Sequence, residues 1–163
     1  MTVYGLQYDT TGVLGFIPQL QAFYVNGAFE RRPYITGRGR VWVDVLGTAP
    51  LEAHWLDVEH GDAAPGRVPT WLSERRHGVE DIGGVYCDRS TLPEVLKAAG
   101  GLPFDLWLAT LDGAADPAVI PELHDLPPTV RLVAIQAYPA GMLGFHADMS
   151  VILSQDYWTR HHA

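Results

Sequence analysis

The chain has very little of several residue types, and each shortage narrows what it can be. Cys87 is its only cysteine, so no internal disulfide can form. Basic residues are scarce: eleven stand against nineteen acidic ones, which gives a net charge of −8 and argues against nucleic acid as a partner. No segment approaches the ~18 apolar residues of a membrane span, and residues 1–6 lack the basic start of an export signal. We therefore expect no membrane partner and no signal peptide.

The composition that remains is that of a globular protein. The 163 residues are 47% hydrophobic and 18% charged, and no linker or low-complexity block divides them. A chain of this length buries about two-thirds of its unfolded surface, enough for a core without a metal or disulfide. We expect one domain over residues 1–163, with no cofactor.

Short β-prone runs recur along the whole chain, and two helices interrupt them. The first helix is predicted from the spacing of Val68, Trp71 and Leu72, and it ends at His77-Gly78. The second is predicted from an N-cap at Ser90-Thr91, Glu94 three residues later and an apolar stripe at Leu92, Val95, Leu96 and Ala99. The eight predicted strands cover residues 3–9, 21–26, 41–46, 54–59, 84–88, 106–110, 132–138 and 149–153.

Other connections carry weaker helical signals. Partial helices are expected at residues 15–20 and 30–34, none after the sixth strand, and a frayed end at His161-His162. Alternating strands and helices favour a parallel sheet, and eight strands favour a closed barrel. The fold class predicted is α/β: a compact TIM-like barrel with five β/α units followed by three strands. An open sheet of fewer strands is the alternative.

The segment around residue 57 carries the clearest chemistry. Side chains alternate along a strand, so Trp55, Asp57 and Glu59 share one face while Leu56 and Val58 take the other. If the apolar face packs under the helices, both carboxyl groups point into the barrel toward the C-terminal ends of its strands. Repulsion would then keep one protonated, the acid and carboxylate combination of glycosidases. The simpler interpretation is two solvated acids on an edge strand, or acids paired with an arginine such as Arg89.

Polar and aromatic residues also occupy the other strand ends. These residue types suit the stacking and hydrogen bonding of a sugar, although each alone is more often a core or turn residue. The candidates are Gln7 and Asp9 on the first strand, Tyr86 on the fifth, Trp107 on the sixth, Gln136 and Tyr138 on the seventh, and Asp148 at the start of the eighth.

In their order, these segments resemble the glycoside hydrolase family 25 lysozymes and the glycoside-hydrolase-like proteins of actinobacteria and their phages. Residues 8–9 and 22–27 resemble the actinobacterial proteins, and residues 57–63 do so especially. The segments that carry the resemblance are Trp55-Leu56-Asp57-Val58-Glu59, Gly84-Val85-Tyr86-Cys87-Asp88-Arg89-Ser90, Leu106-Trp107-Leu108-Ala109, Ala134-Ile135-Gln136-Ala137-Tyr138 and Asp148-Met149-Ser150-Val151.

The resemblance implies cleavage of the β-1,4 link between N-acetylmuramic acid and N-acetylglucosamine in peptidoglycan. Glu59 matches the general acid and Asp57 its carboxylate neighbour, and the polar and aromatic candidates match substrate-binding positions. The first strand departs from the family, whose Gly-Ile-Asp-Val-Ser pattern puts an aspartate where this chain has Gln7. Either Asp9 takes over that role or one acidic group is lost.

Three functions therefore stay open from the sequence. One is a cell-wall glycan hydrolase that uses Glu59 with Asp57 or Asp9. The second is a binding or structural module of the same fold, weak or inactive in catalysis, made in a bacterial cytoplasm and released by lysis or carried on a phage particle. The third is a metal-dependent hydrolase whose ligands would come from His54, His60, Asp62, His146 and Asp148; because a zinc site must gather three or four ligands, we predict no metal.

Overall fold

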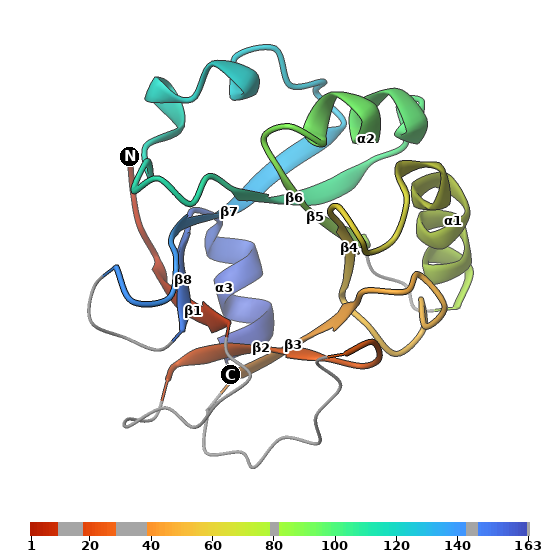
Figure 1. The fold of residues 1–163 in the computed structure, drawn as a ribbon, viewed down its shortest axis with the longest axis horizontal. Helices are drawn as coiled ribbons and strands as arrows, with labels where there is room; N and C mark the ends of the chain where they lie inside the picture. Colours follow the sequence, from red (N-terminus) through yellow and green to blue (C-terminus); the bar gives the residue numbers. More distant parts are fainter. Residues whose placement is uncertain (10–17, 29–38, 79–81, 143–146, 163) are drawn as a thin grey trace.

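The eight predicted strands form one closed barrel in the computed structural model, which describes residues 1–9, 18–28, 39–78, 82–142 and 147–162 (Figure 1). Strands β1 to β7 pair in parallel with their neighbours, and β8 runs antiparallel to both β7 and β1. The strands are β1 (Gly5–Asp9), β2 (Leu20–Tyr24), β3 (Gly39–Asp44), β4 (Trp55–Val58), β5 (Gly84–Asp88), β6 (Phe104–Ala109), β7 (Val130–Tyr138) and β8 (Asp148–Ile152). The barrel is confirmed, and it is a mixed one.

The reversed direction of β8 decides which residues meet at the mouth of the barrel. The C-terminal ends of β1 to β7 lie at one end, and the first residue of β8 joins them there because β8 runs the other way. Asp9, which ends β1, is the register partner of Asp148, which begins β8. The mouth therefore gathers residues from both ends of the chain.

The alternation of side chains along the strands produces an inner and an outer core. Leu20, Val41, Trp55 and Trp107 pack together inside the barrel. Leu56 and Val58 pack outside with residues of the two predicted helices. The assignment of Asp57 to the inner face of β4 is therefore confirmed.

Both predicted helices lie outside the barrel. Helix α1 (Val68–Gly78) follows β4 after a 3₁₀ turn at Pro65–Arg67, and α2 (Leu92–Ala99) follows β5. At the start of α2 the capping differs from the expectation, because Thr91 makes no side-chain cap. Asp88 takes that role, accepting hydrogen bonds from the Ser90 hydroxyl and the Thr91 amide at 2.7 Å each. Gly100 ends α2 in the left-handed conformation, with φ of 60°.

A third helix, α3 (Gln155–His162), overturns the expectation of a helix-free C-terminal third. In Figure 1 it is seen through the ring of strands. Its side chains meet the N-terminal ends of the strands: Trp158 lies against Gly5, and Arg160 is 3.1 Å from Asp105. The His161 ring lies 4.9 Å from that of His54, so this residue is packed and not frayed. The sequence of this segment lacks the apolar stripe from which a helix is usually predicted. Its aromatic side chains hold the helix against the barrel instead.

Within the described residues, the remaining connections contain short 3₁₀ turns and no further α-helix. After β6, 3₁₀ turns occur at Pro117–Val119 and Pro121–Leu123. The partial helices expected at 15–20 and 30–34 lie mostly outside the described residues, and Leu20 begins β2. None of the described helices has the length and apolar character needed to cross a membrane.

Candidate active site

The mouth of the barrel holds a group of carboxyl side chains that act electrostatically on one another. We call them the carboxylate cluster: Asp9, Asp57, Glu59, Asp62 and Asp148. Of these, Asp9, Asp57, Glu59 and Asp148 were predicted for the site from the sequence, and the structure brings them together. No arginine or lysine is among the groups that shift the pKa values of these described carboxyls.

Asp57 is the most deeply buried member of the cluster. It is 4% exposed on the inner face of β4, and its Oδ1 has no hydrogen-bond partner among the described residues. Burial raises the pKa of Asp57 well above its ordinary value, and the charges of Glu59, Asp62 and Asp9 raise it further. Burial and the neighbouring charges therefore both favour the neutral form of Asp57.

Glu59 follows β4 and is half-buried at the rim. Burial raises its pKa, as do the charges of Asp88, Asp62 and Asp148, while a hydrogen bond from Tyr86 lowers it. A partly exposed carboxyl group with a raised pKa keeps its proton to a higher pH than an ordinary glutamate does. Glu59 is therefore a candidate proton donor.

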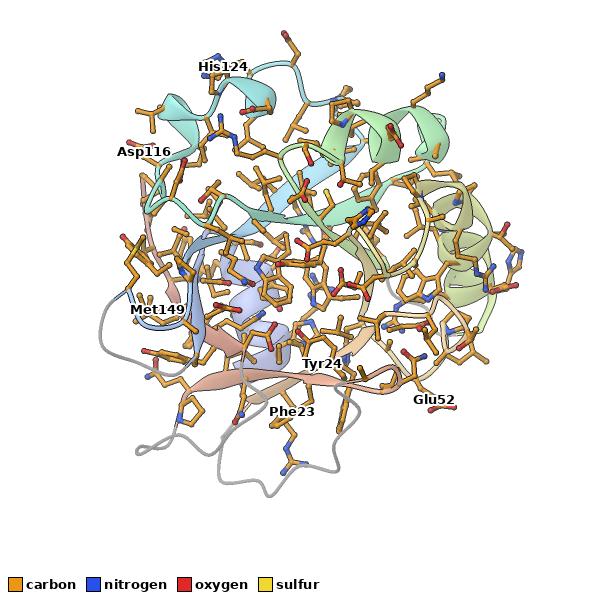
Figure 2. All side chains as sticks on the ribbon, in the orientation of Figure 1. Phe23, Tyr24, Glu52, Asp116, His124 and Met149 are labelled. Carbon is orange, nitrogen blue, oxygen red and sulfur yellow. The ribbon has the colours of Figure 1, made fainter. Side chains whose placement is uncertain are left out.

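Asp9 is paired with a residue that the sequence analysis did not single out. The Tyr24 hydroxyl donates a hydrogen bond to Asp9 Oδ2 at 2.5 Å. Burial raises the pKa of Asp9 to about 7; the Tyr24 hydrogen bond opposes this rise, and the charges of Asp148 and Glu59 add to it. Tyr24 lies on the barrel side of β2, opposite Phe23 (Figure 2). Tyr24 could have been predicted from the sequence, because it ends the second strand and lies on the same face of that strand as Leu20 and Ala22.

Asp148 accepts a hydrogen bond from the Ala140 amide at 2.6 Å. Burial raises the pKa of Asp148, and this hydrogen bond lowers it. Gln136, on β7, is 2% exposed, and its Oε1 has no partner among the described residues. Its register partner on β8 is Ser150. Gln136 therefore offers a buried acceptor from the opposite side of the barrel to β4.

Tyr86 and Trp107 belong to the aromatic packing of the barrel interior. Their rings are 4.7 Å apart, and Trp107 also contacts Trp55 at 5.6 Å. Tyr86 is 6% exposed and donates to Glu59. Trp107 is 1% exposed, and its indole N–H donates to Ser150 Oγ at 2.9 Å. Trp107 is thus part of the packed interior. It does not form the exposed surface on which we expected a sugar to stack.

Gln7 also differs from the expectation. It is fully buried, and its Oε1 accepts a hydrogen bond at 2.6 Å from the hydroxyl of Tyr157, on α3. This helix covers the end of the barrel opposite the mouth. Gln7 therefore connects the barrel to α3 and does not line the carboxylate cluster.

Tyr138 is turned away from the mouth. The pairing of β7 with β8 shifts register between Gln136 and Tyr138, and Tyr138 packs with Tyr8 and Met149 on the outer wall. Strict alternation would have placed Gln136 and Tyr138 on one face. The extra residue reverses that relation, as β-bulges do, so Tyr138 does not join Gln136.

The proposed metal ligands are not gathered by the described residues. His54 lies at the α3 end, where its Nδ1 accepts a hydrogen bond from the Trp42 amide at 2.9 Å, and His146 lies outside the described residues. Oxygens of Asp57, Glu59 and Asp62 do lie within 4.8 Å of one another. Three carboxylates that each give one oxygen supply at most half of the six to eight ligands of Ca²⁺. The charges of Glu59 and Asp62 raise the pKa of Asp57.

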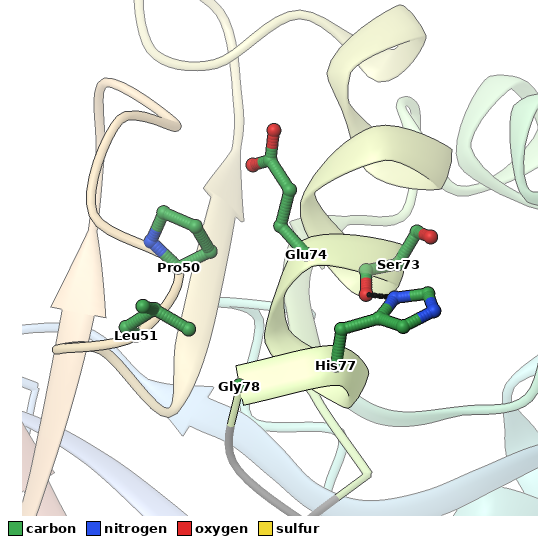
Figure 3. A pocket seen from close by; sticks show the side chains of 6 residues that line it. All are labelled: Pro50, Leu51, Ser73, Glu74, His77 and Gly78. Carbon is green, nitrogen blue, oxygen red and sulfur yellow. Dashed lines mark hydrogen bonds between the residues drawn. The ribbon is translucent and has the colours of Figure 1, made fainter.

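A shallow hollow on the outer surface carries no comparable chemistry (Figure 3). It lies between Pro50, Leu51 and the last turns of α1. Its one carboxylate, Glu74, is paired with Arg67 at 2.5 Å, and Nδ1 of His77 is hydrogen-bonded to the Ser73 carbonyl at 2.7 Å. The carboxylate cluster is therefore the better candidate for an active site.

No known family model, curated protein or solved structure matches this chain. The function must therefore be argued from the geometry of the site.

Proposed function

We propose that this protein is a glycoside hydrolase of the lysozyme type, which cleaves the MurNAc-β-1,4-GlcNAc link of peptidoglycan with Glu59 as general acid. The observation that carries the proposal is the pairing of a half-buried Glu59 with the buried Asp57 at the mouth of a closed α/β barrel. Barrel enzymes place their chemistry at this end, and glycosidases use two carboxyl groups.

The distribution of helices agrees only in part with five β/α units followed by three strands. Helices α1 and α2 follow β4 and β5, and the described connections from β6 to β7 and from β7 to β8 contain no α-helix. The connection from β3 to β4, residues 45–54, is described throughout and contains no helix, so the third expected β/α unit lacks one, and α3 follows β8.

The distance between Asp57 and Glu59 bears on whether this pair could use an inverting mechanism. Carboxylates of inverting glycosidases are ~6.5–9.5 Å apart so that a water fits between them. One oxygen of Asp57 lies within 4.8 Å of one oxygen of Glu59, which is closer than that separation, so we do not assign Asp57 as the base of an inverting mechanism. We propose that Glu59 protonates the leaving oxygen while Asp9 supplies the negative charge that stabilises the oxocarbenium-like transition state.

The uncharged ligand-binding groups fit a glycan. Gln136 offers an amide oxygen without a partner among the described residues to sugar hydroxyl or acetamido groups. A neutral glycan strand needs no positive surface, so the net charge of −8 is compatible with it.

The decisive experiment incubates purified protein with peptidoglycan and measures new reducing ends. Wild type should release them, and Glu59→Gln should not. Glu52→Gln, an exposed acid away from the mouth, is the matched control. No release by the wild type, or full release by Glu59→Gln, would overturn the proposal.

One observation favours the second candidate, a module that binds cell-wall glycan with little turnover. The first-strand position that holds an aspartate in the family is here occupied by Gln7, whose carbonyl oxygen is bound to Tyr157. If this chain is such a module, it should co-sediment with peptidoglycan and release no reducing ends.

A further inference from the structure

The two buried aspartates of the cluster, Asp9 and Asp57, are not equivalent, because they differ in their hydrogen-bond donors. Asp9 Oδ2 receives the hydroxyl of Tyr24 at 2.5 Å. Asp57 is 4% exposed, and its Oδ1 has no donor among the described residues. A donor stabilises the ionised form of a buried carboxyl group, and without one the neutral form is favoured.

We propose that Tyr24 is a positioning residue that favours the ionised form of Asp9, so that Asp9 loses its proton before Asp57, which is held as a neutral acid. This assignment deepens the proposed hydrolase function, on which its catalytic meaning rests. It gives each of three residues a role: Glu59 donates a proton, Asp9 carries the negative charge, and Asp57 stays neutral, so that it adds no second charge beside Asp9.

The surroundings of Asp9 agree with this division. Burial of Asp9 and the nearby negative charges favour its neutral form, and the Tyr24 hydrogen bond opposes them because it favours the charged form. Five titratable groups act with Asp9, and they come from four strands or their ends: Tyr24 of β2, Asp57 of β4, Glu59 after β4, Tyr86 of β5 and Asp148 of β8. The Tyr24 hydroxyl itself stays protonated, since burial and Asp9 both raise its pKa.

The test measures titration of the aspartate side chains directly, without any glycan. Carboxyl ¹³C signals are followed by NMR from pH 3 to 10 in the full chain and assigned with Asp9→Asn and Asp57→Asn. In wild type, Asp9 should ionise near pH 7, and Asp57 only at a higher pH. Tyr24→Phe, which removes one oxygen, should raise the apparent pKa of Asp9 on the order of one pH unit.

Two further variants make the result specific. Tyr8→Phe is the same chemical change beside Asp9 on the outer face of β1, and it should leave the Asp9 titration unchanged. Asp57→Asn imitates a neutral acid, so Asp9 should again ionise near pH 7. If Asp57 carried a charge, this substitution would lower the pKa of Asp9 markedly.

The proposal is overturned if Tyr24→Phe leaves the Asp9 titration unchanged, or if Asp57 ionises before Asp9. Its failure is distinguishable from that of the proposed function. If the titrations are as expected but no reducing ends are released, the proposed hydrolase function is wrong and the roles of Tyr24, Asp9 and Asp57 in the titration stand. If reducing ends are released, the limb of the kcat/KM profile that rises with pH should move upward in Tyr24→Phe and stay in place in Tyr8→Phe.

Discussion

Tyr157 and Gln7, 150 positions apart in the chain, are joined by a 2.6 Å hydrogen bond inside the closed end of the barrel. Gln7 belongs to β1 and Tyr157 to α3, so this contact ties the first strand to the last helix. Tyr157 also packs against Trp55 at 5.6 Å. The C-terminal helix is therefore part of the barrel core.

Replacing Tyr157 with phenylalanine should destabilise the fold by about 1–3 kcal/mol, because the buried Gln7 carbonyl oxygen would lose its donor. Urea unfolding of Tyr157→Phe against wild type measures the change. Tyr138→Phe, on the half-buried outer wall, should stay within about 0.5 kcal/mol. Equal stability of Tyr157→Phe and wild type would mean that this hydrogen bond contributes nothing.

Gly84→Ala should also destabilise the protein, by about 1–3 kcal/mol. A Cβ at residue 84 would overlap the ring of Trp55, which is 1% exposed and confined by Trp107 and Tyr157. The control is Gly66→Ala, where a Cβ would meet no atom within 4 Å. Thermal unfolding of both variants tests the packing, and a normal melting temperature for Gly84→Ala would contradict it.

Hydrolysis should depend on the protonated form of Glu59. Its raised pKa means that activity should fall as the pH rises past that value. Glu59→Gln should lower kcat about 10²–10⁴-fold with unchanged circular dichroism. A pH profile of reducing-end release checks the first expectation, and a flat profile would remove Glu59 from the mechanism.

The stability of the fold should fall between about pH 4 and pH 7. The pKa of Asp9 is about 7 in the folded state against an ordinary 3.8, so the folded state favours its neutral form. That contribution is complete below about pH 4 and is lost as the pH rises toward 7, at about 1.4 kcal/mol for each pH unit of pKa shift. Asp57 acts in the same direction.

Urea unfolding at several pH values measures this slope. Asp9→Asn should flatten it, because an amide does not ionise. A free energy of unfolding that rises between pH 4 and pH 7 would contradict the titration assigned to Asp9.

Glycan cleavage should persist in EDTA, since the mechanism uses carboxyl groups alone. Oxygens of Asp57, Glu59 and Asp62 are close enough to one another for a cation to be considered. Reducing-end release with and without chelator decides the matter. A loss of activity that added Ca²⁺ or Mg²⁺ restores would show that a metal takes part.

Local sequence patterns were sufficient to predict the eight strands, the helices α1 and α2, and the inward direction of Asp57. These features depend on periodicity and on neighbouring residues, and a buried strand or an amphipathic helix carries both in its own segment. The eight β-prone runs also favoured closure, which the pairing of β8 with β1 confirms.

Only the tertiary structure decided the roles of Gln7, Tyr24, Tyr138 and α3. Gln7 and Asp9 share a face of β1, yet they have different partners. Gln7 accepts a hydrogen bond from Tyr157 of α3, and Asp9 accepts one from Tyr24. A one-residue register shift turned Tyr138 outward. Such outcomes depend on partners far away in the chain and on how the strands slide past one another, and neither leaves a periodic signal in the segment itself.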